Sequence, residues 1–355
     1  MINVFCYYFG TGGWCRHAQG FLAALRRYED IALLPWEQPT SREVITPGIA
    51  TMLANARGPM AQNIALGIGP VDNMGTLIGR KKIAYVAWET TRVPVKKRRI
   101  LQQVDEIWVP SQWGKATLLH NGFPADVIKV VPEGVDCDLF RPVLASPFQD
   151  RQPFRFLCVG KWEERKGIVD LVRTYATTFR EEEPVELVLH CANRYIADFD
   201  LARAFQAIQP ARHAAITLCN PMTEHELVTL YNRCDAFVLP TKAEAWGLPI
   251  IEAMACALPV IVTDYSGYQD YLDDTCGYLI KVKNMTRVRD VLFYPGRGYG
   301  RWAQPDLKHL SSLLRYVFEH RDEAREKGVR AREHVAQHWT WDHAARIAHA
   351  YLHRY

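Results

Sequence analysis

The stretch from Leu239 to Thr263, LPTKAEAWGLPIIEAMACALPVIVT, constrains the fold of this chain more than any other. Its pattern predicts the end of a buried strand, a short polar loop, a helix and a second buried strand. Gly247 lets the backbone approach a ligand closely, and Pro249 suits the first turn of a helix, where its missing N–H costs nothing. A strand–loop–helix–strand unit of this kind is typical of an α/β fold.

Two carboxylates lie within this unit, Glu244 in the loop and Glu252 in the predicted first turn of the helix. They flank a helix start whose free N–H groups and positive dipole end suit a phosphate. An anion site with a carboxylate on either side suits a phosphorylated, hydroxyl-rich ligand such as a nucleotide sugar. The plain structural alternative is a strand, loop and helix with two solvated glutamates.

Length and composition narrow the class of protein. The 355 residues suffice for two α/β domains of ordinary size, and the net charge of +4 does not call for a nucleic-acid partner. This charge is compatible with an anionic substrate or an acidic membrane surface. The nine cysteines are scattered and form no Cys-x-x-Cys pair, so we expect buried thiols in a reducing compartment.

The sequence also bears on location. It has no run of about 18 apolar residues, and it enters its first strand without the basic start of a signal peptide. We therefore expect no membrane span and a cytoplasmic location. Four cations, Lys96, Lys97, Arg98 and Arg99, cluster at a predicted helix start. They read either as a solvated helix face or as a peripheral contact with anionic lipid at the inner face of the membrane.

The chain opens with a second strand–turn–helix unit. Ile2 to Tyr8 has strand composition, Gly10-Thr11-Gly12-Gly13 follows, and a helix with one apolar face runs on to Leu25. The geometry suits a phosphate, but Cys15 stands where a dinucleotide-binding fingerprint needs its third glycine. A simple tight turn is the alternative. We expect His17, near the start of this helix, to face solvent.

The rest of the first half predicts further strands at 31–34, 64–68, 82–88, 105–110 and 127–131, with 47–60 poorly patterned. The strand at 82–88 leads into Glu89, at the carboxyl end where ligands of α/β proteins lie. Ser111 is a natural N-cap for the helix that follows the strand at 105–110.

In the second half, a strand at 154–159 runs into Lys161, Arg165 and Lys166, just before a helix that starts near residue 168. Three cations within six positions suit a diphosphate, because they neutralise its charge and stabilise it as a leaving group. A surface loop of mixed charge is the alternative.

Further strands are predicted at 185–190, 215–219, 235–239 and 277–280, and Thr223 with Glu226 fits a capping box. The segment 284–305 is hard to place, and helices follow at 307–318, at 319–338 and after Thr340.

These motifs resemble those of a known family. The run EAWGLPIIEAMACALPVIV, from Glu244 to Val262, resembles the carboxylate-pair signature of retaining glycosyltransferases of family 4, which have the GT-B fold. The run GKWEERKG, at 160–167, is similar to their Gly-Arg…Lys-Gly donor motif, with Lys161 where arginine is commoner. Gly12-Gly13 resembles their N-terminal glycine loop. The resemblance covers most of the chain and is weakest in 40–80 and 284–305.

The resemblance implies an α/β architecture of the GT-B type, in which two Rossmann-like parallel-sheet domains face each other across a cleft. Residues 1–145 would form the acceptor-side domain and 153–338 the nucleotide-sugar-binding domain. Residues 339–355 would form a terminal helix that crosses back to pack on the first domain.

The resemblance also implies an activity. A retaining hexosyltransferase of polysaccharide or glycoconjugate biosynthesis would move a sugar from a UDP- or GDP-sugar to a hydroxyl of a saccharide, lipid-linked or other acceptor. We expect no cofactor and no metal, because cations of the protein supply the charge that the leaving diphosphate needs.

Residue by residue, the resemblance implies two sets of roles. As catalytic residues, Glu244 would bind sugar hydroxyls, Lys166 and Lys161 would stabilise the departing diphosphate, and Glu89 would lie near the transferred sugar, where the family often has His or Asp. The donor would be bound at the glycine loop, the ribose carboxylate, the backbone at the helix start and the nucleobase loop, namely Gly12, Gly13, Glu252, Trp246, Gly247, Leu248, Asn220 and Met222.

Three rival functions stay open. A GT-B sugar-nucleotide epimerase would share the diphosphate site and need no acceptor. A non-catalytic nucleotide-sugar-binding protein would turn nothing over. A nucleotide-dependent oxidoreductase is disfavoured by Cys15 and by the motif around Glu244.

Overall fold

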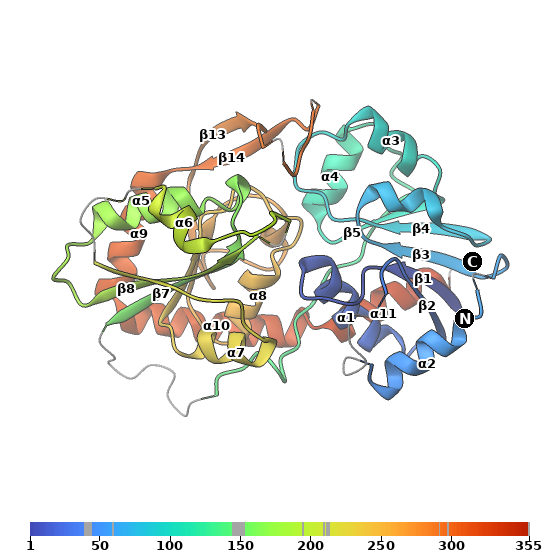
Figure 1. Ribbon diagram of the computed structural model, residues 1–355, viewed down its shortest axis with the longest axis horizontal. Coiled ribbons are helices and arrows are strands. Elements are labelled where there is room, and N and C mark those ends of the chain that lie inside the picture. The colour runs from blue at the N-terminus through green and yellow to red at the C-terminus, as the bar shows by residue number, and fades with distance from the viewer. Residues whose placement is uncertain are drawn as a thin grey trace. The chain divides into compact units, whose positions relative to one another are not determined.

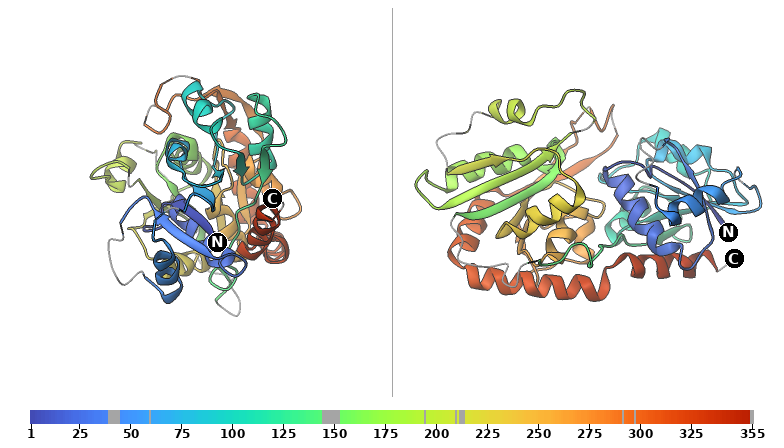
Figure 2. Two further views of the ribbon diagram at one scale, coloured as in Figure 1. Left: turned by 90° about the vertical axis from the view of Figure 1, so that its right-hand side faces the viewer. Right: turned by 60° about the horizontal axis from the view of Figure 1, so that its bottom comes forward.

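The computed structural model describes residues 1–38, 45–58, 60–143, 153–193, 195–208, 210, 214–290, 292–296 and 298–353. The chain divides into two compact units. Unit 1 comprises Met1–Gly134, Gly296–Gly300 and Trp339–Tyr355, and unit 2 comprises Val135–Pro295 and Arg301–His338. Each unit has a parallel sheet with helices packed against it (Figures 1 and 2).

The sheet of unit 1 has six parallel strands in the order β2-β1-β3-β4-β5-β6. The strands are β1 (Ile2–Cys6), β2 (Ile31–Pro35), β3 (Ile64–Ile68), β4 (Lys81–Tyr85), β5 (Glu106–Val109) and β6 (Ile128–Val130). Ile2 is in register with both Ile31 and Ile64, so β1 lies between its two neighbours. All residues of β1 and β3 are buried, as expected of parallel strands that are covered on both faces.

Helices cover both faces of this sheet. They are α1 (Gly13–Leu25), α2 (Pro47–Asn55), α3 (Val95–Leu101), α4 (Gln112–His120) and α11 (Trp341–Leu352), with a 3₁₀ helix, η2 (Val71–Thr76). Side chains of α1, α2 and α11 share one core cluster with the strands, whereas side chains of η2, α3 and α4 share the other. Alternate strand residues supply the two clusters, since Val4 belongs to the first and Phe5 to the second.

The last helix, α11, packs against α1 within unit 1 (Figure 1). Its buried face consists of Ala344, Ala345, Ala348 and Leu352, and the three small side chains allow the two helices to lie close together. Gly20 of α1 faces the Trp341 indole, and a Cβ at Gly20 would lie 2.3 Å from that ring. The approach of the two helices therefore depends on the absence of a side chain at this position.

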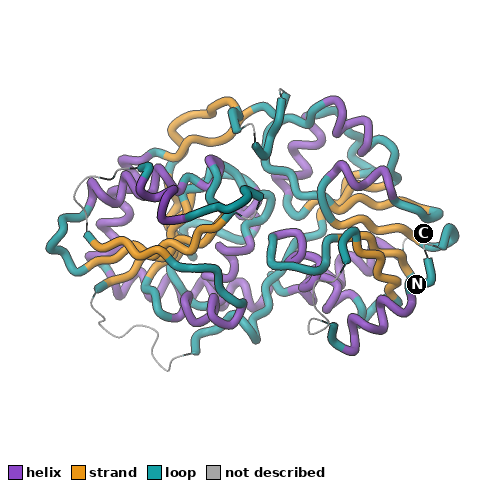
Figure 3. The backbone as a smooth tube through the Cα atoms, viewed as in Figure 1, coloured by secondary structure: helices purple, strands orange, loops and turns teal. Residues whose placement is uncertain are grey.

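Unit 2 also has six parallel strands, in the order β12-β11-β10-β7-β8-β9. The strands are β7 (Phe154–Lys161), β8 (Val185–Ala192), β9 (Ala215–Leu218), β10 (Ala236–Leu239), β11 (Val260–Thr263) and β12 (Tyr278–Ile280). The helices are α5 (Ile168–Thr178), α6 (Leu201–Gln206), α7 (Glu224–Asn232), α8 (Leu248–Ala255), α9 (Leu307–Glu319) and α10 (Arg321–His338), with 3₁₀ helices η3 (Glu164–Lys166) and η4 (Gly267–Asp270). Figure 3 shows the strands of unit 2 side by side with helices around them.

The prediction of an α/β fold with parallel sheets is confirmed, and several elements start where the sequence places them. Ser111 caps α4 by accepting a hydrogen bond from the Gly114 N–H, and Thr223 and Glu226 form the predicted capping box. The strand predicted at 82–88 is shorter, because β4 ends at Tyr85. Among the described residues, no helix is both long enough and apolar enough to cross a membrane.

Two poorly patterned segments have regular structure. Part of 47–60 is the helix α2, which begins after Thr46, whose hydroxyl accepts from the Ile49 N–H. The two ends of the segment 284–305 lie in an antiparallel pair, β13 (Val282–Arg287) and β14 (Arg301–Pro305). Trp302 of β14 is fully buried and packs against Tyr294 at a ring distance of 5.1 Å. The two strands pair with each other rather than with the main sheet, so the alternation typical of a central strand is missing from the sequence.

The prediction that His17 faces solvent is wrong. His17 is 1% exposed, and its ring packs on Tyr85 at 4.4 Å and on Trp341 at 5.9 Å between centroids. Its Nδ1 lies 3.3 Å from a carboxylate oxygen of Glu133, which is also buried. The sequence around α1 does not reveal this burial, because α11, more than 300 residues further along the chain, covers that face of the helix.

Candidate functional site

Two loops of unit 2 meet at the carboxyl end of its sheet. One follows β7 and contains η3, and the other joins β10 to α8. Because β7 and β10 are parallel neighbours, the loops that leave them lie at the same edge of the sheet. Gly167 has a left-handed backbone with φ of 68°, and a Cβ there would lie 2.3 Å from the Pro240 carbonyl oxygen. The close approach of the two loops therefore requires glycine at this position.

Glu244 lies at the centre of this contact, between two cations of the first loop. Its Oε1 is 2.7 Å from Lys166 Nζ and accepts a hydrogen bond from the Thr241 hydroxyl at 2.8 Å. Its Oε2 is 3.0 Å from a terminal guanidinium nitrogen of Arg165. Glu244, Lys166 and Arg165 are all buried, so these charges are balanced by each other rather than by water.

A second carboxylate extends the ion pairs. Glu163 is buried and receives Arg165 on one oxygen at 2.6 Å and Lys161 on the other at 2.9 Å. Arg165 also donates to the Ala243 carbonyl at 2.6 Å. The ion-pair chain thus runs Lys161, Glu163, Arg165, Glu244, Lys166 and holds three cations against two anions. The excess of positive charge suits a bound anion.

The surroundings keep Glu244 ionised. Burial by itself would raise its pKa, but the charges of Arg165 and Lys166 and the hydrogen bonds from Lys166 and Thr241 outweigh burial and lower the pKa to about 2. Glu244 therefore carries its negative charge throughout the physiological pH range. In this state it can accept hydrogen bonds but cannot donate a proton.

The backbone on both sides of Glu244 is anchored to the turn after β11. The Glu244 N–H donates to the Ser266 hydroxyl at 2.8 Å, and the Gly267 N–H donates to the Glu244 carbonyl at 2.9 Å. A Cβ at Gly267 would lie 1.9 Å from the Ala245 carbonyl oxygen, so the turn can approach only as glycine. These contacts fix the position of the carboxylate independently of its ion pairs.

The start of α8 follows directly. Gly247 precedes the helix in a left-handed conformation with φ of 97°, and Leu248 is the first helical residue. The Tyr271 hydroxyl lies 2.9 Å from the Trp246 carbonyl and 3.2 Å from the Gly247 carbonyl, and the Trp246 ring packs on Tyr271 at 4.8 Å. Trp246 is 1% exposed, so its side chain anchors the turn at the start of α8.

Glu252 lies one turn further than the sequence suggests. Because α8 begins at Leu248, Glu252 is its fifth residue and falls in the second turn rather than the first. It is 3% exposed, and its Oε2 accepts from the Tyr231 hydroxyl at 3.1 Å. The prediction of two solvated glutamates, the plain alternative for this segment, is wrong for both Glu244 and Glu252.

The other predicted site residues are spread over both units. Asn220 is exposed and Met222 half-buried in the loop between β9 and α7 of unit 2. Gly12 precedes α1 and Gly13 begins it in unit 1, and a Cβ at Gly13 would meet nothing within 4 Å. Glu89 is half-buried in unit 1, four residues after β4 ends. The structure thus groups Lys161, Lys166 and Glu244, with Trp246, Gly247 and Leu248 following in the chain, whereas Gly12, Gly13 and Glu89 belong to the other unit.

Two aromatic residues near Lys161 were not foreseen. The Lys161 ammonium lies 3.8 Å from the ring centre of Phe293 and 5.0 Å from that of Tyr195, and the two rings pack edge to face at 5.7 Å. Phe293 lies in the segment 284–305, which has no clear pattern, and Tyr195 lies in a loop after β8, so nothing in the sequence connects either ring to residue 161. The buried pairing of Glu163 with Arg165 was also missed, although the alternating charges of the run KWEER were a usable signal.

The basic cluster at 96–99 is partly engaged within unit 1. Lys97 pairs with Asp72, and Arg98 donates to the Asn121 carbonyl and lies over the Phe123 ring at 5.9 Å. Lys96 and Arg99 are exposed on α3.

Comparisons with known proteins agree with these motifs. Residues 145–292 match the family model described as Glycosyl transferases group 1. The chain is 27% identical over 265 residues to alpha-maltose-1-phosphate synthase of Mycolicibacterium smegmatis, covering 70% of this chain and 63% of that one. It is 25% identical over 281 residues to the GDP-mannose-dependent alpha-(1-6)-phosphatidylinositol monomannoside mannosyltransferase of Mycobacterium tuberculosis, covering 74% and 66%. The aligned part therefore spans about two thirds of the length of each relative or slightly less.

The fold has close structural counterparts. The crystal structure of Anabaena Alr3699/HepE in complex with UDP-glucose superposes with a TM-score of 0.73 at 13% identity, covering 99% of this chain and 98% of that one. At this identity the likeness concerns the fold, and it extends over both units. Residues 145–292 are thus similar to the glycosyl transferases of group 1, and the architecture of the chain is that of the GT-B fold.

Proposed function

We propose that this protein is a retaining glycosyltransferase that moves a sugar from a nucleoside-diphosphate sugar to an acceptor hydroxyl. The observation that carries the proposal is Glu244, buried and ionised between Lys166 and Arg165 at the edge of the unit 2 sheet. The names of similar proteins support this donor class, because one relative is described as GDP-mannose-dependent and HepE was crystallised with UDP-glucose.

The reaction breaks the bond between the anomeric carbon of the sugar and a diphosphate oxygen, and the electron pair leaves with the diphosphate. The acceptor oxygen bonds to the anomeric carbon as its hydroxyl gives its proton to the leaving diphosphate. Negative charge therefore grows on the leaving diphosphate, where Lys166 and Lys161 would be more effective in the transition state than in the ground state. Glu244 would accept hydrogen bonds from sugar hydroxyls. Its negative charge would also stabilise the positive charge that develops at the anomeric carbon.

The nucleotide would be held by the remaining donor residues of unit 2. The backbone N–H groups of residues 246–248 would meet the phosphates or the sugar, because these residues lie at the start of α8, where the helix dipole favours an anion. Glu252 would accept from the ribose diol, in place of or beside its bond to Tyr231. Asn220 and Met222 would lie against the nucleobase.

Unit 1 would serve the acceptor. Gly12 and Gly13 would leave room for the phosphates and the acceptor, and Glu89 would lie near the transferred sugar. Lys96 and Arg99, the exposed members of the basic cluster, would attract anionic lipid if the acceptor is lipid-linked. A cytoplasmic protein with peripheral membrane contact fits such an acceptor.

We further propose that transfer needs no metal. The sequence contains two Asp-x-Asp triplets, at 136–138 and 198–200, which is the pattern that could hold a metal-bound diphosphate. Asp136 instead accepts from the N–H groups of Asp138 and Leu139, and Asp200 caps α6. These carboxylates have local structural roles, whereas the cations of the Glu244 site are of the sign that a diphosphate requires.

The test is nucleotide release from a panel of UDP-, GDP-, ADP- and dTDP-sugars, measured with and without a metal chelator and with and without candidate acceptors. Lys166→Ala is the variant, and Lys308→Ala, an exposed lysine on α9 of the same unit, is the matched control. Release from one donor that resists chelator, survives Lys308→Ala and is lost in Lys166→Ala supports the proposal.

Other outcomes identify the rivals. Isomerised donor without transfer to any acceptor would show an epimerase. Donor binding by calorimetry without turnover under any acceptor would show a binding protein. The absence of binding to every donor would refute the proposed site itself.

A further inference from the structure

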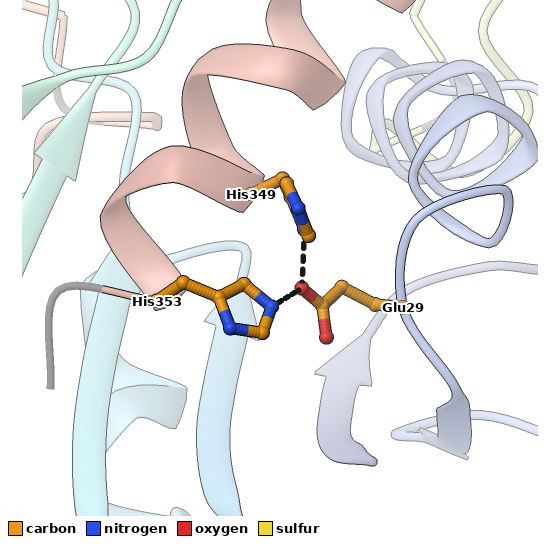
Figure 4. A group of neighbouring side chains, drawn as sticks. All are labelled: Glu29, His349 and His353. Atoms are coloured by element: carbon orange, nitrogen blue, oxygen red, sulfur yellow. Dashed lines mark hydrogen bonds and ion pairs between the residues drawn. The ribbon is translucent and has the colours of Figure 1, made fainter.

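Three side chains of the kinds that bind metal ions meet in unit 1. None of them is among the residues proposed to act on the donor. Glu29 lies in the turn between α1 and β2, His349 lies near the end of α11, and His353 follows that helix. The two histidines are four residues apart, so the helical repeat brings them to one side of α11. Figure 4 shows both imidazoles directed at the Glu29 carboxylate.

The geometry is tight. His349 Nδ1 is 2.7 Å and His353 Nε2 is 2.8 Å from the same oxygen of Glu29, and the two rings are 4.4 Å apart between centroids. The three ligand atoms all lie within 4.8 Å of one another. Glu29 has a side chain that is only 9% exposed, whereas His349 and His353 are 37% and 61% exposed.

We propose that Glu29, His349 and His353 form a binding site for a divalent transition-metal ion. In the arrangement shown in Figure 4, each imidazole nitrogen must carry a proton to bond the carboxylate. A metal ion would replace those protons and be bound by the two nitrogens and the carboxylate oxygen. Two imidazoles and one carboxylate are a ligand set that Zn²⁺, Ni²⁺, Co²⁺ and Cu²⁺ accept.

The ligand spacing permits this exchange. Metal–ligand bonds of about 2.0–2.1 Å in a tetrahedral site separate neighbouring ligand atoms by roughly 3.3 Å. Each imidazole would therefore retreat from Glu29 by about half an ångström, which side-chain rotation provides for two histidines that are partly exposed. Water has access to the remaining coordination position because His353 lies at the surface.

Two arginines near this cluster are neutralised by an aspartate, which reduces their repulsion of a bound cation. Arg27, next to the end of α1, and Arg346 of α11 both pair with Asp342, at 2.9 Å and 3.3 Å. The Tyr28 hydroxyl donates to the same Asp342. In the described part of the chain, the Glu29 carboxylate is paired with the two histidines.

A metal at this place would fasten the end of α11 to the turn after α1, two elements that are far apart in the sequence. The site lies within unit 1, whereas the ion-pair chain around Glu244 lies within unit 2. We therefore assign the metal a structural role, so that its removal lowers the stability of unit 1 without touching the proposed chemistry. The inference does not depend on the proposed function.

The test uses the untagged, metal-stripped full chain. Binding of Zn²⁺ and Ni²⁺ is measured by calorimetry, and Co²⁺ is followed by its visible absorption, which separates nitrogen and oxygen ligands from the thiolates of the nine cysteines. The variants are Glu29→Gln and His353→Ala. His334→Ala is the matched control, because His334 and His338 form another i, i+4 histidine pair on α10, with rings 5.5 Å apart.

We expect one ion per chain, a Co²⁺ spectrum without thiolate charge-transfer bands, and a rise in the unfolding temperature with metal. Each ligand variant should weaken binding by more than about tenfold, the loss typical of removing even an outer-shell partner. His334→Ala should bind as the unmodified chain does. Equal affinities in all three variants, thiolate bands, or loss of binding in His334→Ala alone would each overturn the proposal.

Discussion

Lys166 Nζ lies 2.7 Å from Glu244 Oε1, and the two residues are 78 positions apart in the chain. Both residues are buried. Their two loops contact each other where Gly167 of the first loop approaches the Pro240 carbonyl of the second. A lysine held in this way has a defined position and a charge that water does not screen. The pair is therefore suited to an anion that develops charge during a reaction.

Replacing Lys166 tests this role directly. In Lys166→Ala the proposed leaving diphosphate loses a cation whose effect is greatest in the transition state, so turnover should fall by about 10²–10³-fold. The dissociation constant of the donor should change by less than about tenfold. Steady-state kinetics and calorimetry measure the two quantities, and circular dichroism verifies folding. A variant that keeps full turnover would remove Lys166 from the mechanism.

Glu244 should be important for stability as well as for binding. Glu244→Gln leaves Arg165 and Lys166 buried without their shared anion, which typically costs about 3–5 kcal/mol in the free energy of unfolding. Urea unfolding at pH 7 measures the loss. Lys308→Ala, at an exposed position, should stay within about 0.5 kcal/mol of the unmodified protein.

The same variant should reveal the titration of Glu244. The pKa of this group in the folded protein is about 2, below the ordinary 4.5, so its stabilising contribution is complete above pH 4.5 and declines as the pH falls towards 2. The difference in unfolding free energy between the unmodified protein and Glu244→Gln should therefore shrink by roughly 2 kcal/mol between pH 6 and pH 3. A difference that stays constant over this range would contradict the lowered pKa.

Phe293 should affect donor binding through Lys161. Its ring holds the Lys161 ammonium at 3.8 Å, and such contacts contribute about 0.5–2 kcal/mol. If Lys161 binds the diphosphate, Phe293→Ala should weaken nucleoside diphosphate binding roughly 2- to 30-fold, because the ammonium loses its orientation. Phe293→Tyr keeps an aromatic face and should bind normally. Equal affinities in the alanine and tyrosine variants would show that the ring does not position Lys161.

Much of the unit 2 site could be predicted from the sequence, because it lies in two continuous motifs. The strand, loop and helix around Glu244 follow from local pattern, and Lys166 is adjacent to a glycine that ends its loop. The partner of each residue could not be predicted. Glu244 meets Arg165 because β7 and β10 are neighbours in the sheet. No local sequence pattern encodes this order of strands.

Failures of the sequence-based interpretation have a common physical cause. His17 was expected at the surface because α1 alone does not show that α11 covers it. The hairpin β13–β14 lacks the alternation of a central strand, because its strands pair only with each other. Burial that depends on a distant segment leaves little trace in the local periodicity.

Gly167 provides the sharpest test of how the two loops are assembled. Gly167→Ala places a Cβ 2.3 Å from the Pro240 carbonyl oxygen, and the left-handed backbone with φ of 68° adds its own strain. The clash is with backbone, which cannot rotate away, so the free energy of unfolding should fall by more than about 2 kcal/mol. Gly75→Ala, where a Cβ would meet nothing within 4 Å, is the matched control and should change stability by less than about 1 kcal/mol. Because displacement of this loop also moves Lys166, the proposed transferase should lose turnover in Gly167→Ala at temperatures where the variant is still folded. Full stability in Gly167→Ala would mean that the two loops do not approach as closely as the Lys166–Glu244 pair requires.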